Sequence, residues 1–262
     1  MYFETYNDYT KEYRPGISKI TRNKWYIRLD KDHSLICKRY SGNYTLHFSR
    51  KGLVTALFEY SYNKENKISK VIRYIYTYTK DQLISLIIGH DVVTSMLTDK
   101  MEFTYNSDNQ IEEEYITEYL SNGEMLWEIE CTHHYEGNYH EMRHYNSFYE
   151  ELHISETWYN AETGLVEFKL SDEMGNNYDW NKKIYDKRGH LIREYILNEN
   201  GTVCDESEYF YFPKKHVKVS YGECKNVLET LTEYDDKKNW KRKSYFENGQ
   251  LYCVEEQTVE YY

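Results

Sequence analysis

The chain has 262 residues, a formal net charge of -11 and a mean hydropathy of -0.90. Its 31 tyrosines, set against 9 Phe, 5 Trp and only 2 Pro, favour thin, half-buried sheets and argue against a disordered chain. The acidic balance, without a clustered basic face, excludes phosphate-directed nucleic-acid binding and favours a basic partner.

The cysteines and the apolar segments indicate where the protein works. The five cysteines, at positions 37, 131, 204, 224 and 253, form no Cys-x-x-Cys pair and are odd in number. This spacing argues against a disulfide framework or a zinc ribbon and predicts a reducing compartment. The N-terminal residues lack the basic and apolar regions of a secretory signal, and the longest apolar stretch, 83–88, is too short to span a bilayer. We therefore expect a cytoplasmic protein without a membrane segment.

The first residues, 1–28, break at Pro15-Gly16 and are predicted to form an N-terminal cap. Residues 29–262 are predicted to form one continuous repeat domain, because a single unit recurs through them. In this unit an aromatic or apolar residue is followed by a short polar turn, and an apolar residue stands six positions later. The copies are Leu29 to Leu35, Tyr62 to Ile68, Tyr105 to Ile111, Tyr119 to Met125, Tyr159 to Leu165, Tyr185 to Leu191, Leu197 to Val203, Tyr211 to Val217, Tyr221 to Val227, Tyr234 to Trp240 and Tyr245 to Leu251, with shorter variants at Phe48 to Leu53 and Tyr78 to Leu83.

Two intervals interrupt the regular spacing. Residues 84–100 carry apolar side chains that fit either a short helix or a pair of strands with a long loop. Residues 138–153 place five apolar or aromatic side chains at roughly helical spacing, which again allows a short helix. Neither interval has a flanking Pro-, Gly- or Ser-rich linker, so neither predicts a domain boundary.

The unit has the chemistry of a β-hairpin. In its clearest copy, Tyr185 ends a strand, Asp186 can bond the backbone of the turn, and Gly189 supplies the positive φ that closes it. Between turns, segments such as 71–78 alternate as strands do. The later copies follow one another too closely for a crossover helix, so the fold predicted is an all-β, antiparallel meander of repeated hairpins.

Two copies carry a family resemblance: Tyr185-Asp186 with Gly189 and Leu191, and Tyr245-Phe246 with Asn248-Gly249 and Leu251. They resemble the YD repeats of RHS-type proteins, and the related Tyr/Gly hairpin repeats of bacterial toxin–antitoxin or immunity proteins. The copy at 211–217 departs from the pattern, since it has neither Asp nor Gly. Large RHS proteins wind such repeats into a shell around a toxin, and this chain is too short for that. The resemblance implies an open or curled sheet with a toxin-neutralising or surface-binding role.

Acidic residues gather on two neighbouring predicted strands. Alternation puts Glu112, Glu114 and Glu118 on one face of the first strand. It puts Glu124, Glu128 and Glu130 on one face of the next. If these faces align, they form an acidic stripe that suits a basic partner; the alternative is a solvated face that discourages edge pairing. Tryptophans beside turns offer a second binding surface: Trp127, Trp158, Trp180 and Trp240.

His140-Glu141-Met142-Arg143-His144 matches the HExxH pattern of zinc peptidases. On a helix, its two histidines would bind zinc and Glu141 would activate the metal-bound water. Against this, the motif contains the charged Arg143, and no third ligand follows at a recognised spacing; the candidates are Glu151, His153 and Glu167. On a strand, His140 and His144 would stand too far apart to share one ion.

The neighbouring Cys131, His133 and His134 extend this region into a wider cluster. Cys131 and His133, two apart on a strand, would share a face. Together with His140 and His144 they could form a structural metal site across a hairpin. The alternative reading, which we favour, is a polar strand surface. We therefore expect no catalysis, no cofactor and no bound metal.

The function that the sequence favours is non-catalytic binding of another protein. Charge, the missing signal and the repeat resemblance favour a bacterial immunity-type protein that occludes a basic toxin domain, such as a nuclease or deaminase. One alternative is a structural or adhesive module of the cell surface. The other is a zinc hydrolase acting through His140, Glu141 and His144.

Overall fold

The computed structural model describes residues 16–29, 35–39, 43–222 and 225–262. These residues form nineteen strands and no helix. The strands are β1 (Ile17–Leu29), β2 (Leu35–Arg39), β3 (Asn43–Phe48), β4 (Val54–Tyr62), β5 (Ile68–Tyr78), β6 (Ile84–Asp91), β7 (Leu97–Tyr105), β8 (Ile111–Tyr119), β9 (Met125–Glu136), β10 (Tyr139–Asn146), β11 (Glu151–Asn160), β12 (Leu165–Asp172), β13 (Asn177–Tyr185), β14 (Leu191–Leu197), β15 (Val203–Phe212), β16 (Lys215–Tyr221), β17 (Lys225–Tyr234), β18 (Trp240–Glu247) and β19 (Gln250–Tyr261).

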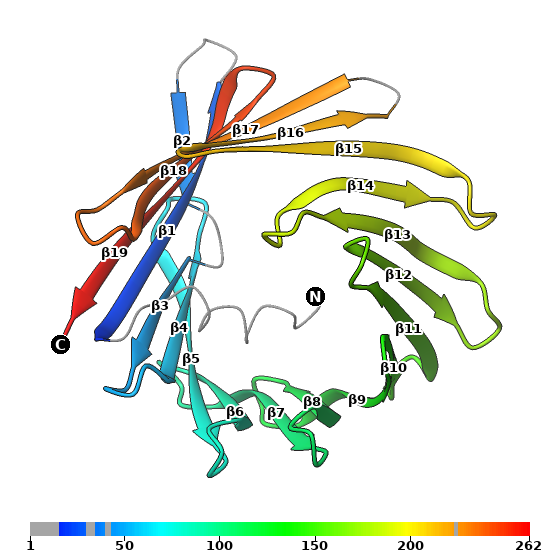
Figure 1. Cartoon of the computed structure of the whole chain (residues 1–262). Coiled ribbons are helices and arrows are strands. Elements are labelled where there is room, and N and C mark those ends of the chain that lie inside the picture. Colours follow the sequence, from blue (N-terminus) through cyan, green and yellow to red (C-terminus); the bar gives the residue numbers. More distant parts are fainter. Residues whose placement is uncertain (1–15, 30–34, 40–42, 223–224) are drawn as a thin grey trace.

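The strands form a closed antiparallel barrel (Figure 1). From β3 to β19 each strand pairs with the next one along the chain. The first strand, β1, pairs with β19 along one edge. Its other edge pairs with β3 through residues 19–22 and with β2 through residues 25–29. Because β2 and β3 share one position beside β1, the nineteen strands occupy eighteen positions around the ring.

Closure of the ring shows that the expected open or curled sheet is wrong, although the all-β meander is confirmed. The physical reason lies in β1, whose thirteen residues give both edges of the sheet a partner and leave no row of unpaired backbone groups. Residues 17–28 of the expected N-terminal cap belong to this strand. Gly16 lies in the turn before it, and residues 1–15 lie outside the described residues.

Neither interval that allowed a short helix forms one, and residues 84–100 take the other form allowed for them, a pair of strands with a loop. Residues 84–100 form β6, a turn and the start of β7, and residues 138–153 contain β10 and the start of β11. Both strands of the second interval are paired along their length. The helix-like spacing of apolar residues there was produced by two strands and a turn in succession. None of the described residues forms a helix long and apolar enough to cross a membrane.

The repeat unit is a strand–turn–strand junction. Tyr185 is the last residue of β13 and Leu191 the first of β14. Between them, the Asp186 carboxylate accepts hydrogen bonds from the amides of Arg188 (2.8 Å) and His190 (2.9 Å), and Gly189 has a φ of 79°. The same pair of side-chain-to-amide bonds recurs at Asn63, Asn106, Asp172 and Asn198. At these five junctions, an Asn or Asp side chain shapes the turn by accepting hydrogen bonds from two backbone amides.

Some predicted junctions differ in detail. The two shorter variants also span six positions, from Phe48 to Val54 and from Tyr78 to Ile84. There, hydroxyls replace the carboxylate or amide, since Ser49 and Thr79 accept from the amides of residues 53 and 83. Other hairpins are tighter than the unit, because β15 continues to Phe212 and only two residues separate it from β16.

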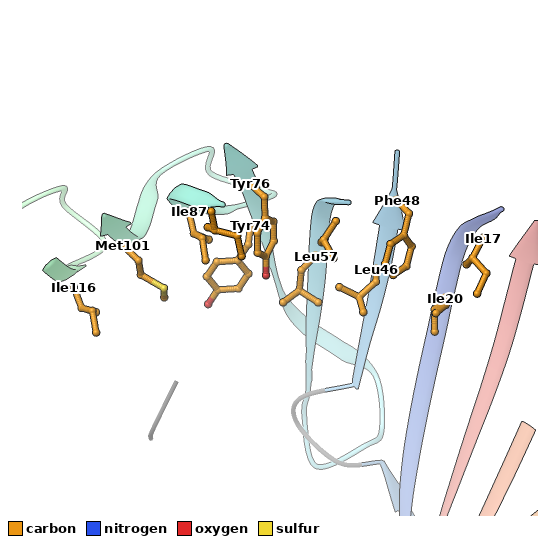
Figure 2. Close-up of a cluster of buried hydrophobic side chains, with 12 residues drawn as sticks. Ile17, Ile20, Leu46, Phe48, Leu57, Tyr74, Tyr76, Ile87, Met101 and Ile116 are labelled. Carbon is orange, nitrogen blue, oxygen red and sulfur yellow. The ribbon is translucent and has the colours of Figure 1, made fainter. Parts of the chain in front are cut away.

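Following the register around the ring separates two faces of the barrel wall. One, which we call the core face, carries the buried cluster of β1 and β3–β8, and its side chains lie in a row across these strands (Figure 2). The cluster consists of Ile17, Ile20, Leu46, Phe48, Val54, Leu57, Tyr74, Tyr76, Ile84, Ile87, Met101 and Ile116. The other, which we call the charged face, carries ion pairs such as Lys19–Glu260 (2.6 Å) and Arg193–Glu208 (2.7 Å).

The wall is thin and extensively solvated on both faces. The chain exposes 17124 Å², whereas a compact monomer of 32.0 kDa would expose roughly 12,000 Å² by the scaling of surface with mass. This excess agrees with the composition, which is rich in tyrosine and has a low mean hydropathy. It also means that much of the surface is available for contact with other molecules.

Candidate functional site

The HExxH motif lies on β10, a strand, and its parts are separated there. Alternation places His140, Met142 and His144 on the core face and Glu141 and Arg143 on the charged face. At about 3.3 Å per residue, the two histidines stand roughly 13 Å apart along the strand. The Glu141 carboxylate instead accepts hydrogen bonds from Arg143 (2.7 Å) and from the Tyr139 hydroxyl (2.9 Å). The motif therefore lacks the arrangement that a zinc peptidase needs.

The three suggested third ligands are no better placed. Glu151 and His153 lie on β11, where they contact each other at 3.4 Å, and Glu167 accepts from the indole of Trp180 at 2.7 Å. Within the described part of the chain, no group of three His, Cys, Asp or Glu side chains is arranged to hold a metal ion.

The histidines instead build a polar network on the core face of β9 and β10. His133 Nδ1 lies 3.0 Å from His140 Nε2, and His133 Nε2 lies 3.3 Å from a carboxylate oxygen of Glu114. The two imidazoles are nearly parallel, at 5°, while the ring of Tyr135 stacks on His140 at 4.4 Å.

A second row of polar side chains crosses β8 to β12 beside this network. The register places its members next to one another on the core face: Glu114, Cys131, His144, His153 and Asp172. The rings of His144 and His153 lie 5.1 Å apart. As expected from alternation, Cys131 and His133 share a face, whereas His134 lies on the opposite one.

The electrostatics of these groups favour neutral forms. Burial, reinforced by His133, lowers the pKa of His140 to about 4. Burial, reinforced by His153, lowers the pKa of His144 to about 4. Burial also raises the pKa of the Cys131 thiol to about 12, so this cysteine is a poor nucleophile at neutral pH. The two groups of side chains are suited to holding strands β8 to β12 together near neutrality.

The predicted acidic stripe does not form as one surface. Glu112, Glu114 and Glu118 share the core face of β8, as expected, and Glu114 is buried there. Glu128 and Glu130 of β9 pair with Thr117 and Tyr115, which places them on the charged face. Glu124 stands apart from both sets, in the turn before β9.

The four tryptophans have different surroundings. Trp127 is half-buried and packs against the core cluster, and Trp240 lies beneath the guanidinium of Arg22 at 4.9 Å. Trp180 is anchored by its bond to Glu167. Trp158 is the exposed one, on β11. They do not gather into one aromatic patch.

The structure shows one feature that sequence reasoning missed: a shallow hollow of about 340 Å³ between the β13–β14 turn and the end of β15. Two of its lining side chains, His190 and Tyr211, stack with ring centroids 4.7 Å apart, and Tyr211 also stacks on His216 of β16 at 4.5 Å. His190 also contacts Asp186 at 3.2 Å. The aromatic run 209–212 was the available signal. The lining residues are Asp186, Arg188, His190, Ile192, Tyr209, Phe210, Tyr211 and Phe212.

Comparisons with known proteins give distant structural likenesses. No family model matches the chain, and no curated protein sequence matches it. Among solved structures, it is similar to part of a TcdB2-TccC3-Cdc42 crystal structure, with 10% identity and a TM-score of 0.39 over 86% of this chain and 15% of that one. It is also similar to a porin-like protein from Bacteroides uniformis, with 11% identity and a TM-score of 0.34 over 93% of this chain and 98% of that one.

A porin-like protein from Bacteroides vulgatus is similar at 9% identity and a TM-score of 0.32, over 94% of this chain and 98% of that one. The chain thus spans about 15% of the length of the first of these matched chains and nearly all of the porin-like ones. At these TM-scores the likenesses do not assign the chain to a family or a function.

Proposed function

We propose that this protein works by binding another protein and does not catalyse a reaction. The observation that carries this proposal is the surface: a wall exposing 17124 Å² on which large apolar side chains stand in the open. Val93 is 85% exposed, Met174 84% and Tyr149 65%. Apolar groups left in solvent in this way are typical of contact surfaces.

The titratable groups support the same proposal. The residues of the candidate zinc-hydrolase site, His140, Glu141 and His144, lie on two faces of β10, where Glu141 binds Arg143 and His140 contacts His133. A catalytic site brings such groups together beside a space for substrate. Their dispersal favours binding.

The finer proposal is a bacterial immunity-type protein, working in the cytoplasm, that occludes a basic toxin domain. The net charge of -11 favours a basic partner, and the hairpin units resemble those of immunity components. Cys131, Cys204 and Cys253 are free thiols, which suits a reducing compartment.

Ion pairs on both faces favour an aqueous setting. Lys218 and Glu194 meet at 3.3 Å on the core face, and Arg193 and Glu208 meet at 2.7 Å on the charged face. A strand wall that contacts lipid instead carries an unbroken apolar band on that side.

Co-purification from the native host tests this function. A tagged full-length chain should retain one basic protein in a stoichiometric ratio, and the retention should weaken at high salt because the attraction is electrostatic. Expression of that partner alone should slow growth, and co-expression of this chain should restore it. Recovery of no stoichiometric protein from host cells, with an inert protein of equal charge as control, would contradict the proposal.

A further inference from the structure

We propose that five consecutive turns on one rim of the barrel, the docking arc, form the surface that contacts the partner, and that the partner presents an apolar patch bordered by lysines and arginines. The docking arc consists of residues 92–96, 120–124, 147–150, 173–176 and 198–202. This inference rests on the proposed protein-binding function and specifies where and how binding occurs.

The turns of the docking arc share a rim because of the topology. Successive strands are antiparallel, so every second turn emerges at the same end of the barrel. The arc turns join β6 to β7, β8 to β9, β10 to β11, β12 to β13 and β14 to β15, and these ten strands are neighbours around the ring. The five turns are therefore adjacent segments of one edge, although they span more than a hundred residues of sequence.

Large apolar side chains occupy the tips of four of these turns. Exposed apolar side chains on these turns include Val93, Leu120, Phe148, Tyr149 and Met174. On the opposite rim, the five turns that alternate with them (79–83, 106–110, 137–138, 161–164 and 186–190) carry no exposed large apolar side chain, and all their residues are described. The asymmetry shows that the apolar tips are not a general property of the turns.

All the charged side chains of the docking arc are negative, and four of its five turns carry one. Glu124, Glu150, Glu173 and Glu199 each stand exposed on a different turn, and the five turns contain no lysine or arginine. Negative charge around an apolar surface favours a partner with basic residues around its own apolar patch. It also opposes binding to the anionic surface of a membrane.

The apolar tips are held in place before any partner arrives. The amide of Val93 donates to the Asp91 carboxylate at 2.9 Å, that of Phe148 to Asn146 at 2.9 Å, and that of Met174 to Asp172 at 3.0 Å. In each turn, the Asx side chain that organises the hairpin also fixes the backbone of the apolar residue. Less conformational entropy is then lost on binding, which favours a contact role for these residues.

Site-directed photo-crosslinking in the native host tests the docking arc. A benzophenone amino acid is placed singly at Val93, Phe148 or Met174, and in matched controls on exposed residues of the opposite rim, at Ser107, Thr163 or Lys187. The full-length chain is used, and the circular dichroism of each variant is compared with that of the parent. We expect the arc positions to yield one basic protein by mass spectrometry and the control positions to yield none of it.

A charge test uses the partner identified in this way. The variant with Glu124→Lys, Glu150→Lys and Glu173→Lys should associate with it at least about tenfold more slowly at low salt, because the attraction that speeds encounter is reversed. Lys187→Glu on the opposite rim is the control and should leave the rate unchanged. An unchanged rate in the triple variant would overturn the proposed chemistry of the partner.

The remaining outcomes separate failure of the docking arc from failure of the proposed function. A co-purifying protein that crosslinks from the opposite rim, or equally from both rims, would overturn the arc and leave protein binding intact. Crosslinks to a second copy of this chain, or flotation of the chain with phosphatidylcholine vesicles, would overturn the arc as a surface for a basic protein. No protein captured from either rim, together with none in co-purification, would overturn both proposals.

Discussion

Tyr78 ends β5, and its hydroxyl donates a 2.7 Å hydrogen bond to the carbonyl oxygen of Val54 at the start of β4. Tyr105, at the end of β7, makes the same bond to the carbonyl of Ile84 at 2.7 Å. Burial raises the pKa of Tyr78 to about 12, so its hydroxyl remains a donor. At these two junctions Tyr does what Phe could not: its hydroxyl satisfies a carbonyl at the start of the preceding strand.

Two turn glycines allow a prediction at this scale, because both have positive φ but different surroundings. A Cβ at Gly189 would meet open space, whereas a Cβ at Gly164 would overlap the carbonyl oxygen of Tyr185. Gly189→Ala should therefore lower the free energy of unfolding by about 1–2 kcal/mol from backbone strain alone. Gly164→Ala should cost more, because the backbone of the next strand must also move. Urea denaturation of both variants checks the order; equal losses would contradict the close approach at Gly164.

At the scale of elements, the hairpin β9–β10 shows how secondary structure decides which side chains of a motif come together. On a helix, His140 and His144 would lie one turn apart on one side. On a strand, they remain on one face but point to different neighbours: His140 contacts His133, and His144 packs against His153. Glu141, the would-be base, moves to the opposite face and binds Arg143. The motif therefore becomes part of a structural network.

This network predicts sensitivity to mild acid. The pKa values of His140 and His144 are lowered from 6.5 to about 4 in the folded chain, so below pH 6.5 the unfolded chain binds more protons than the folded one. The free energy of unfolding should then fall as the pH drops from 6.5 toward 4. The groups facing these rings are Glu114, Cys131, His133 and His153.

Urea denaturation across that pH window, with and without His140→Gln and His144→Gln, measures the effect. The double variant should show a shallower loss than the parent between pH 6.5 and 4. A parent chain whose stability is flat over the window would contradict the buried, neutral state of the two imidazoles.

At the scale of the whole molecule, the seam between the chain's first and last described strands decides the architecture. Ile20 of β1 lies opposite Val259 of β19 on one side and Leu46 of β3 on the other. The amide of Tyr262 also donates to the carbonyl of Gly16 at 2.9 Å. Buried apolar contacts and backbone bonds therefore continue across the seam, and the ring has no free edge there.

Hydrogen–deuterium exchange tests closure directly. The amides of β1 and β19 that face each other, between residues 19 and 26 and between 253 and 260, should exchange as slowly as those of interior strands such as β4 and β5. An open meander would leave every second amide of these strands facing solvent. Fast exchange confined to alternate residues of β1 and β19 would show that the ring is open in solution.

The sequence by itself determined most of the strands, many of their ends and their antiparallel order, and left residues 84–100 and 138–153 open to short helices. These features depend on interactions within a few residues: Asp186 bonding its own turn, Gly189 at positive φ, and tyrosines at strand ends. Closure, the separation of the acidic residues and the arrangement of the rims were decided only by the tertiary structure. Closure requires β1 to meet β19 across the whole chain, a pairing that no local pattern specifies.

The acidic residues separate because a one-residue change in register at a bulge, such as that between Glu118 and Tyr119, moves side chains to the opposite face. The rim on which a turn lies depends on the number of strands before it, because the direction of each strand sets the end at which the next turn emerges.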